Sequence, residues 1–305
     1  MYYLIYGCFF LLSLLPMRVL YMVSDLAYLI VYRWLGYRKN VVFGNLKIAF
    51  PEKTEKELED IARKFYHNLL DSFIETIKLF SASQRFLGRR VTANQEILEP
   101  LFKSGKSCQV HLGHTFNWEW GQLALTRLTD YQIIVVYMPI TNRVFEKMMY
   151  RLRTRTGNIF ISAKNMSESM ALYKNSQYLL GLVSDQSPGR LDTAYWANFF
   201  NRPTAFVSGP EKGAKAGNLP VVFASIVKPK RGYYHATFSI ATEDPSVLKE
   251  GELTLLYAAF MEKTIRNNPE MWLWSHRRWK HTYDPKYKDN WIGEKTAVST
   301  LDAGR

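Results

Sequence analysis

His114 and Glu119 are the residues whose types and spacing best fit chemistry on a hydroxyl group. They lie in the run HLGHTFNWEW, with four residues between them, where a short apolar segment gives way to a helical pattern. A neutral imidazole can take a proton from an alcohol near physiological pH, and a carboxylate can fix its tautomer and stabilise the imidazolium. The pair therefore predicts a general base, His114, oriented by Glu119, that activates a hydroxyl group for acyl transfer.

The competing interpretation is that both residues are ordinary surface or core residues, since the chain has 6 histidines. The local pattern favours the catalytic interpretation. Residues 107–112 are typical of a strand and residues 117–128 of a helix, so His114 would lie at a strand-to-helix junction, where free backbone N–H groups favour negative charge. The N–H groups around residues 115–117 are candidates for holding a tetrahedral oxyanion. His111, inside the expected strand and without a carboxylate at matching distance, is predicted to be structural.

Two further groups of residues have the chemistry of a binding site. Arg151, Arg153 and Arg155 form a dense basic patch, and guanidinium groups bind phosphate through paired hydrogen bonds. A solvated helix face explains the same patch equally well. Asp185 and Gln186 follow the apolar run YLLGLV, so they should emerge at the carboxyl end of a strand, where α/β folds gather ligands, unless they form a plain turn.

The chain resembles the bacterial lipid A biosynthesis acyltransferases, the late acyltransferases within the lysophospholipid acyltransferase superfamily. The segment from His114 to Glu119 is similar to the family's element of a histidine, four residues and an acidic residue, although Phe116 stands where glycine is frequent. The other matching segments keep the family's order along most of the chain: Asn45-Leu46 with Ala49-Phe50-Pro51, Arg153 before Gly157, Asp185-Gln186 with Gly189-Arg190, Phe199-Phe200 with Pro203-Thr204-Ala205, and Trp272 to Lys280.

This resemblance implies a function and roles for particular residues. The donor would be a fatty acyl group on acyl carrier protein, and the acceptor a hydroxyl of a phosphorylated lipid A precursor in lipopolysaccharide biosynthesis. The catalytic residues would be His114 and Glu119, and the residues expected to bind or shape the substrate site are Asn117, Trp118, Arg153, Asp185, Gln186 and Arg190. The sequence has no zinc-type spacing, no glycine-rich phosphate loop and only two cysteines, so we expect neither a metal nor a cofactor.

Composition indicates a membrane setting. The formal net charge is +13, which predicts attraction to anionic lipids, nucleic acid or an acidic protein. The first 16 residues, MYYLIYGCFFLLSLLP, carry no charge and lack the pattern of a cleaved signal peptide. We expect a retained anchor over residues 1–35 that either spans or lies in the bacterial inner membrane, with basic residues after it that place the protein on the cytoplasmic face. A buried core helix is the alternative.

The remaining pattern predicts the fold. Thr54 and Glu57 form a capping box that starts a long helix with apolar residues at helical spacing from Leu58 to Ile77. Strands are expected at residues 107–112, 132–137, 158–161, 177–183, 221–227 and 233–240, mostly alternating with helices. This order predicts an α/β protein, an αβα sandwich around a mixed sheet, with an N-terminal hydrophobic membrane-anchor helix and one catalytic domain over residues 36–305.

Two other functions stay open from the sequence. An enzyme of this kind could acylate a different lipid, such as a lysophospholipid, an aminolipid or a glycolipid. The run MWLWSHRRWKHTYDPKY, followed by Lys288, mixes aromatic and basic residues in a way that also suits base stacking, so a non-catalytic membrane or nucleic-acid binder is the other alternative. The apolar N-terminus favours a membrane over nucleic acid.

Overall fold

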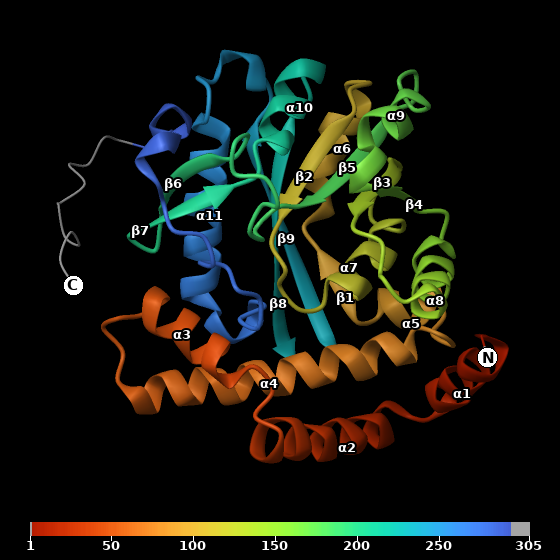
Figure 1. Ribbon diagram of the computed structural model, residues 1–305. Helices are drawn as coiled ribbons and strands as arrows, with labels where there is room; N and C mark the ends of the chain where they lie inside the picture. Colours follow the sequence, from red (N-terminus) through yellow and green to blue (C-terminus); the bar gives the residue numbers. More distant parts are fainter. Residues whose placement is uncertain (1, 294–305) are drawn as a thin grey trace.

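The strands assemble into one large mixed sheet that is covered by helices (Figure 1). The computed structural model describes residues 2–293. The strand order is β1-β9-β8-β2-β5-β3-β4, in which only the β8–β9 pair is antiparallel, and β6 and β7 form a separate antiparallel hairpin. The strands are β1 (Val91–Ala93), β2 (Cys108–Leu112), β3 (Gln132–Tyr137), β4 (Ile159–Ser162), β5 (Tyr178–Val183), β6 (Tyr195–Phe199), β7 (Arg202–Phe206), β8 (Val221–Lys230) and β9 (Tyr233–Thr242).

The α-helices connect and cover these strands. They are α1 (Tyr2–Leu14), α2 (Met17–Tyr28), α3 (Lys39–Ala49), α4 (Glu55–Lys78), α5 (Gln84–Gly88), α6 (Leu98–Lys103), α7 (Trp118–Leu125), α8 (Arg143–Thr154), α9 (Met166–Ala171), α10 (Gly209–Gly217) and α11 (Glu252–Asn267). A π-helical turn, Leu29–Trp34, continues α2. Short 3₁₀ turns lie at Gln95–Ile97, Ala163–Asn165, Pro245–Val247, Pro269–Met271 and Pro285–Asn290.

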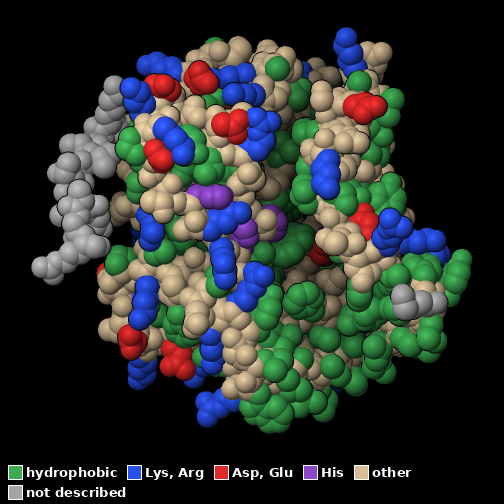
Figure 2. Space-filling view, viewed as in Figure 1, with side chains coloured by type: hydrophobic (Ala, Val, Ile, Leu, Met, Phe, Trp, Pro, Cys, Tyr) green, Lys and Arg blue, Asp and Glu red, His purple; other side chains and the backbone are tan. Residues whose placement is uncertain are grey.

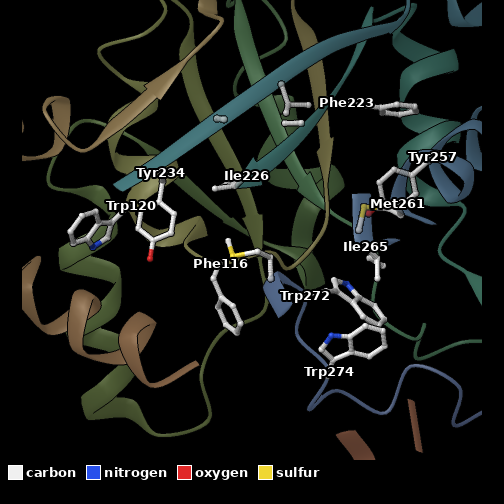
Figure 3. Packing of buried hydrophobic residues seen from close by; sticks show 14 of the residues in the cluster. Phe116, Trp120, Phe223, Ile226, Tyr234, Tyr257, Met261, Ile265, Trp272 and Trp274 are labelled. Atoms are coloured by element: carbon white, nitrogen blue, oxygen red, sulfur yellow. The ribbon is translucent and has the colours of Figure 1, made fainter. Parts of the chain in front are cut away.

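Helices cover both faces of the sheet. Successive residues of a strand point to opposite faces, so Phe223 and Ile226 of β8 face different layers. Phe223 packs its ring against Tyr257 of α11, whereas Ile226 approaches Gly121 of α7 (Figure 3). Burying apolar side chains in both layers removes their surface from water, which is the main driving force for this arrangement. The expectation of an α/β fold around a mixed sheet is confirmed, and the sheet is mostly parallel.

The predicted strands are found close to their expected bounds, but three strands were not predicted. β1 has only three residues, and β6 and β7 form a hairpin outside the main sheet, with Pro203 inside β7. Such short or proline-containing segments give a weak period-2 pattern, so the sequence carries little signal for them.

The long helix α4 begins as predicted and departs from the prediction near its end. Thr54 and Glu57 form the capping box, with the Thr54 N–H donating to Glu57 Oε2 at 2.8 Å. The early apolar positions are buried, but Phe73 is 62% exposed. In that part of α4 the buried positions are polar instead: Asp71, Ser72 and Glu75. The expectation that Phe73 belongs to the buried face of α4 was therefore wrong.

The N-terminal segment forms two helices instead of one anchor helix. Within residues 2–293 no single helix is long and apolar enough to cross a bilayer; α1 together with Met17–Trp34 passes by length and composition, but the two parts are bent by 114°. In Figure 1, α2 lies outside α4, on the side away from the sheet. The residues after about Trp291 are mostly small and polar, which is typical of a loosely ordered tail, and most of that tail lies outside the described residues.

Candidate active site

The carboxyl ends of β2 and β5 bring the candidate base and a carboxylate together. These parallel strands are neighbours, with Leu112 opposite Val183. His114 and Asp185 each lie two residues beyond that pair, so the register places them side by side. His114 Nδ1 is 2.5 Å from Asp185 Oδ1, and the His114 backbone N–H donates to Asp185 Oδ2 at 2.9 Å. The carboxylate therefore fixes both the ring and the backbone of His114.

Asp185 is a buried carboxylate held by several donors. Its side chain is 2% exposed, and Trp272 Nε1 donates to Oδ2 at 2.6 Å. Burial alone would raise the pKa of Asp185, but the charge and hydrogen bonds of His114 and the hydrogen bond from Trp272 outweigh burial and lower it. Gly113 permits this close approach, since a Cβ atom there would lie 3.0 Å from Asp185 Oδ2 and 2.1 Å from Met261 Cε.

The two ring nitrogens of His114 differ in their surroundings. Nδ1 contacts Asp185, whereas Nε2 has no hydrogen-bond partner within residues 2–293. The side chain is 22% exposed, and its ring meets the Trp118 ring edge-on with centroids 5.5 Å apart. Figure 2 shows histidine side chains beside a central hollow of the surface, with lysine and arginine side chains around it.

Glu119 has a different partner from the one predicted. Arg153 donates through Nε at 3.1 Å to Oε2 and through a terminal nitrogen at 2.5 Å to Oε1 of Glu119, and Trp118 Nε1 donates to Oε1 at 3.2 Å. Within the described part of the chain no hydrogen bond joins Glu119 to His114. The predicted partner of His114 was therefore wrong, because the carboxylate that contacts the imidazole is that of Asp185. His114 and Glu119 lie on one short segment of the sequence, whereas Asp185 reaches His114 only because β2 and β5 pair.

Arg153 is an ion-pair residue in this structure. Its side chain is 16% exposed and that of Glu119 is 7% exposed. Burial disfavours the charged guanidinium, but the hydrogen bond and charge of Glu119 prevail, and the pKa of Arg153 is raised. The pair joins α7 to α8 beside the candidate base. The Arg153 guanidinium is paired within the protein, and its expected role in binding substrate stays a prediction. Of its neighbours, Arg151 is exposed, and Arg155 donates to the main-chain oxygen of Leu79.

Asn117 is a helix cap and not an accessible substrate ligand. It is fully buried, and its Oδ1 accepts from the Trp120 N–H at 3.2 Å at the start of α7. Its amide nitrogen donates to Glu75 Oε2 at 2.8 Å. The expectation that Asn117 contacts substrate is not supported, because both ends of the amide are already paired below the surface.

Two backbone N–H groups proposed for the oxyanion are also already paired. The Thr115 N–H donates to the Gly113 carbonyl at 2.7 Å, and the Phe116 N–H donates to the Met271 carbonyl at 3.0 Å. The expectation for these two groups was therefore wrong, because this loop pairs with the segment that contains Met271 and Trp272.

The remaining predicted site residues, Gln186 and Arg190, follow β5 in the chain. Gln186 follows Asp185 directly and is partly exposed, without a side-chain hydrogen bond in the described residues. Arg190 is exposed and donates to Asp192 at 2.6 Å. Within residues 2–293 no hydrogen bond or ion pair joins Arg190 to His114, so its predicted role at the acceptor stays a prediction. His111 is fully buried, and burial lowers its pKa to about 3, as suits a structural histidine.

Sequence reasoning missed the role of the C-terminal tryptophan. Trp272 and Trp274 are buried and pack edge-on, with ring centroids 4.8 Å apart (Figure 3). The hydrogen bond from Trp272 to Asp185 was not predicted, because it joins residues that are 87 positions apart. Among residues 2–293, no group of three or more histidine, cysteine or acidic side chains is arranged to hold a metal ion.

The fold and the site define an α/β protein in which a histidine, backed by a buried carboxylate, is placed to take a proton. Comparison with known proteins then gives the family. Residues 1–281 match the family described as bacterial lipid A biosynthesis acyltransferase. The chain belongs to this family, which indicates an acyltransferase of lipid A biosynthesis.

Two curated relatives agree with this assignment. The chain is 20% identical over 248 residues to a lipid A biosynthesis palmitoleoyltransferase of Escherichia coli (strain K12), covering 81% of this chain and 80% of the relative. It is similar to the same extent, with the same coverage, to a lipid A biosynthesis acyltransferase of Shigella flexneri.

Proposed function

We propose that this protein transfers a fatty acyl chain from an acyl thioester on acyl carrier protein to a hydroxyl group of a lipid A precursor. The observation that carries the proposal is the contact between His114 Nδ1 and Asp185 Oδ1 at 2.5 Å, together with the partly exposed ring of His114. A carboxylate on Nδ1 stabilises the tautomer in which Nδ1 carries the proton, and that tautomer leaves Nε2 with the lone pair that a general base needs.

The proposed reaction needs no acyl-enzyme. His114 Nε2 removes the proton from the acceptor hydroxyl as its oxygen bonds to the thioester carbonyl carbon. The tetrahedral intermediate then expels the sulfur, the carbon–sulfur bond breaks, and the imidazolium returns its proton to the leaving thiolate. Asp185 stabilises the imidazolium through this sequence, while the Glu119–Arg153 ion pair holds α7 to α8.

The charge of the chain fits both proposed partners. Acyl carrier protein is acidic, and a lipid A precursor carries phosphates, so a protein with a net charge of +13 attracts either one. On α8, the exposed residues Arg143, Lys147 and Arg151 supply positive charge. Lys147 and Arg151 also lie over the rings of Tyr2 and Tyr6 on α1, at 4.7 and 4.9 Å, so this charge borders the apolar N-terminal helices.

The outward face of α2 supports membrane association. In a protein surrounded by water, a surface helix turns its apolar side inward. Here Met22 is 70% exposed and Leu26 is 60% exposed, whereas Ser24 is buried. Figure 2 shows the same region as a wide hydrophobic surface over the N-terminal helices. An exposed apolar surface of this kind marks a membrane or protein interface.

We propose that α1 and α2 lie in the bilayer interface. The 13 residues of α1 rise about 20 Å, less than the roughly 30 Å hydrocarbon core. The bend of 114° after α1 suits two helices that lie along one surface. The use of acyl carrier protein and the basic residues Arg18, Arg33 and Arg38 after the apolar segment favour the cytoplasmic face of the inner membrane.

The activity is tested by incubating the full-length protein with a labelled acyl carrier protein thioester and a panel of acceptors. The panel contains a phosphorylated lipid A precursor, a lysophospholipid and an aminolipid, and products are identified by mass spectrometry. We expect transfer to the lipid A precursor, and a loss of about 10² to 10⁴ in rate for His114→Ala. Transfer to another lipid alone would show that the proposed acceptor is wrong. A wild-type rate for His114→Ala would show that His114 is not the base.

Membrane association is tested with vesicles of phosphatidylethanolamine and phosphatidylglycerol. The double change Met22→Glu and Leu26→Glu should reduce sedimentation with vesicles, because it places charge on the outward face of α2. The matched control is Leu172→Glu, an apolar side chain that is 80% exposed and directly follows α9, a helix that lies away from α2 (Figure 1). Equal binding of the double variant and the control would contradict the proposed surface.

A further inference from the structure

Helix α2 is attached to the protein by polar side chains on its inner face. Two acidic residues of α4, one turn apart, each accept a hydrogen bond from α2. Tyr21 donates its hydroxyl to Glu75 Oε1 at 2.7 Å, and Ser24 donates its hydroxyl to Asp71 Oδ1 at 2.8 Å. Asp71 is 2% exposed and Glu75 is fully buried. Because a buried carboxylate without partners is costly, these hydrogen bonds define where α2 sits on α4.

Glu75 contacts both α2 and the loop that carries the candidate base. Its Oε2 atom accepts from Asn117 Nδ2 at 2.8 Å and from the Tyr234 hydroxyl at 2.6 Å. Its main-chain oxygen accepts from Trp120 Nε1 at 3.0 Å. Asn117 caps α7, so Glu75 holds the residue that sets the start of this helix. The same short segment contains His114 and Glu119.

Asp71 differs from Glu75 in what lies on its other side. Its remaining partners are Lys228, at 3.3 Å, and Arg231, at 2.6 Å, both on the β8–β9 hairpin. Within the described residues, none of the hydrogen bonds of Asp71 reaches the segment from His114 to Glu119. Each carboxylate accepts a hydrogen bond from a hydroxyl group of α2, and Asp71 has a second link to α2 because Arg231 also pairs with Asp25. Of the two carboxylates, only Glu75 also bonds to Asn117 in the loop from His114 to Glu119.

We propose that Glu75 is a positioning residue for acyl transfer, and that the chain Tyr21–Glu75–Asn117 links the seating of the membrane-facing helix α2 to the geometry of the loop from His114 to Glu119. The inference rests on the proposed function. The outward face of α2 lies at the bilayer, and the inner face of the same helix contacts Glu75. The position of α2 at the bilayer therefore sets the position of the loop from His114 to Glu119.

The chain is tested by two variants that each remove one buried hydroxyl between α2 and α4. Tyr21→Phe takes a donor from Glu75, and Ser24→Ala takes a donor from Asp71. A displacement of about 1 Å at a reacting group can cost about 10²-fold in rate, so a partial shift through Asn117 should lower kcat by about tenfold in Tyr21→Phe. We expect KM to change by less than about twofold, because the loop positions the base and leaves ground-state binding intact.

Ser24→Ala is the matched control and should keep kcat within about twofold of wild type. Thermal unfolding of both variants shows whether they lose similar stability. Equal losses of kcat in the two variants, or an unchanged kcat in Tyr21→Phe, would overturn the link.

Tyr234→Phe keeps the test decisive if Tyr21→Phe does not fold. It removes a different donor from the same Oε2 atom that holds Asn117, and it leaves α2 unchanged. A lower kcat with an unchanged KM is expected there too, and an unchanged kcat would remove the positioning role of Glu75. Failure of the proposed function is detected separately, because the wild-type protein would then transfer no acyl group to the lipid A precursor.

Discussion

Replacing Asp185 with asparagine should reduce kcat by about 10² to 10⁴ while leaving the fold intact. The asparagine oxygen can take the place of Oδ2, which accepts from the His114 N–H at 2.9 Å and from Trp272 Nε1 at 2.6 Å. The amide nitrogen then faces His114 Nδ1. It donates to Nδ1 and so favours the tautomer that carries its proton on Nε2, where the base must be free.

The size of this effect comes from the burial of the pair. Asp185 is 2% exposed, so water screens the imidazolium–carboxylate attraction weakly, and loss of one partner of such a pair costs about 3 to 5 kcal/mol. At about 1.36 kcal/mol per decade of rate, this range corresponds to roughly two to nearly four decades.

The assay is single-turnover acyl transfer from a labelled thioester, with Glu119→Gln measured beside Asp185→Asn. Glu119→Gln keeps the size of the side chain and changes the ion pair with Arg153. It leaves the contact between Asp185 and His114 in place. It should therefore lose less activity than Asp185→Asn. If Asp185→Asn stayed within tenfold of wild type while Glu119→Gln lost most of its activity, the orienting role would belong to Glu119 and the geometric argument would be refuted.

Three more outcomes are expected from the same structure. Arg153→Lys should lower the free energy of unfolding in urea by about 1 to 3 kcal/mol, because one ammonium cannot reproduce the paired hydrogen bonds to Glu119; an unchanged midpoint would contradict this. Phe116→Ala should cost about 3 to 5 kcal/mol in the same assay, since Phe116 is 1% exposed and packs against other rings. Burial lowers the pKa of His276 from 6.5 to about 4, so the unfolded chain binds a proton there first and stability falls as the pH drops from about 6.5 towards 4. His276→Asn should reduce that fall. If the unfolding midpoint dropped by the same amount between pH 7 and pH 5 in the wild type and in the variant, His276 would not be responsible.

Much of the fold could be predicted because its signals are local. The strand expected at residues 132–137 is β3 itself, and the capping box at Thr54 and Glu57 marks the start of α4. Period-2 and period-3.6 patterns depend on neighbouring residues, which a single sequence shows directly. The end of α4 escaped this reasoning, because Glu75 is buried by partners from α2, β9 and the loop at Asn117 that lie far away in the chain.

The sequence by itself determined which residue is the candidate base and where the segment around it lies: His114 follows an apolar strand and precedes a capped helix. Only the tertiary structure decided which carboxylate holds that base. Asp185 is 71 residues away from His114, and it arrives because β2 and β5 pair in parallel with Leu112 opposite Val183. Strand pairing is a long-range contact whose register follows from packing the whole sheet. The sequence therefore favoured Glu119, the carboxylate nearer in the chain, although Glu119 pairs with Arg153 and not with His114.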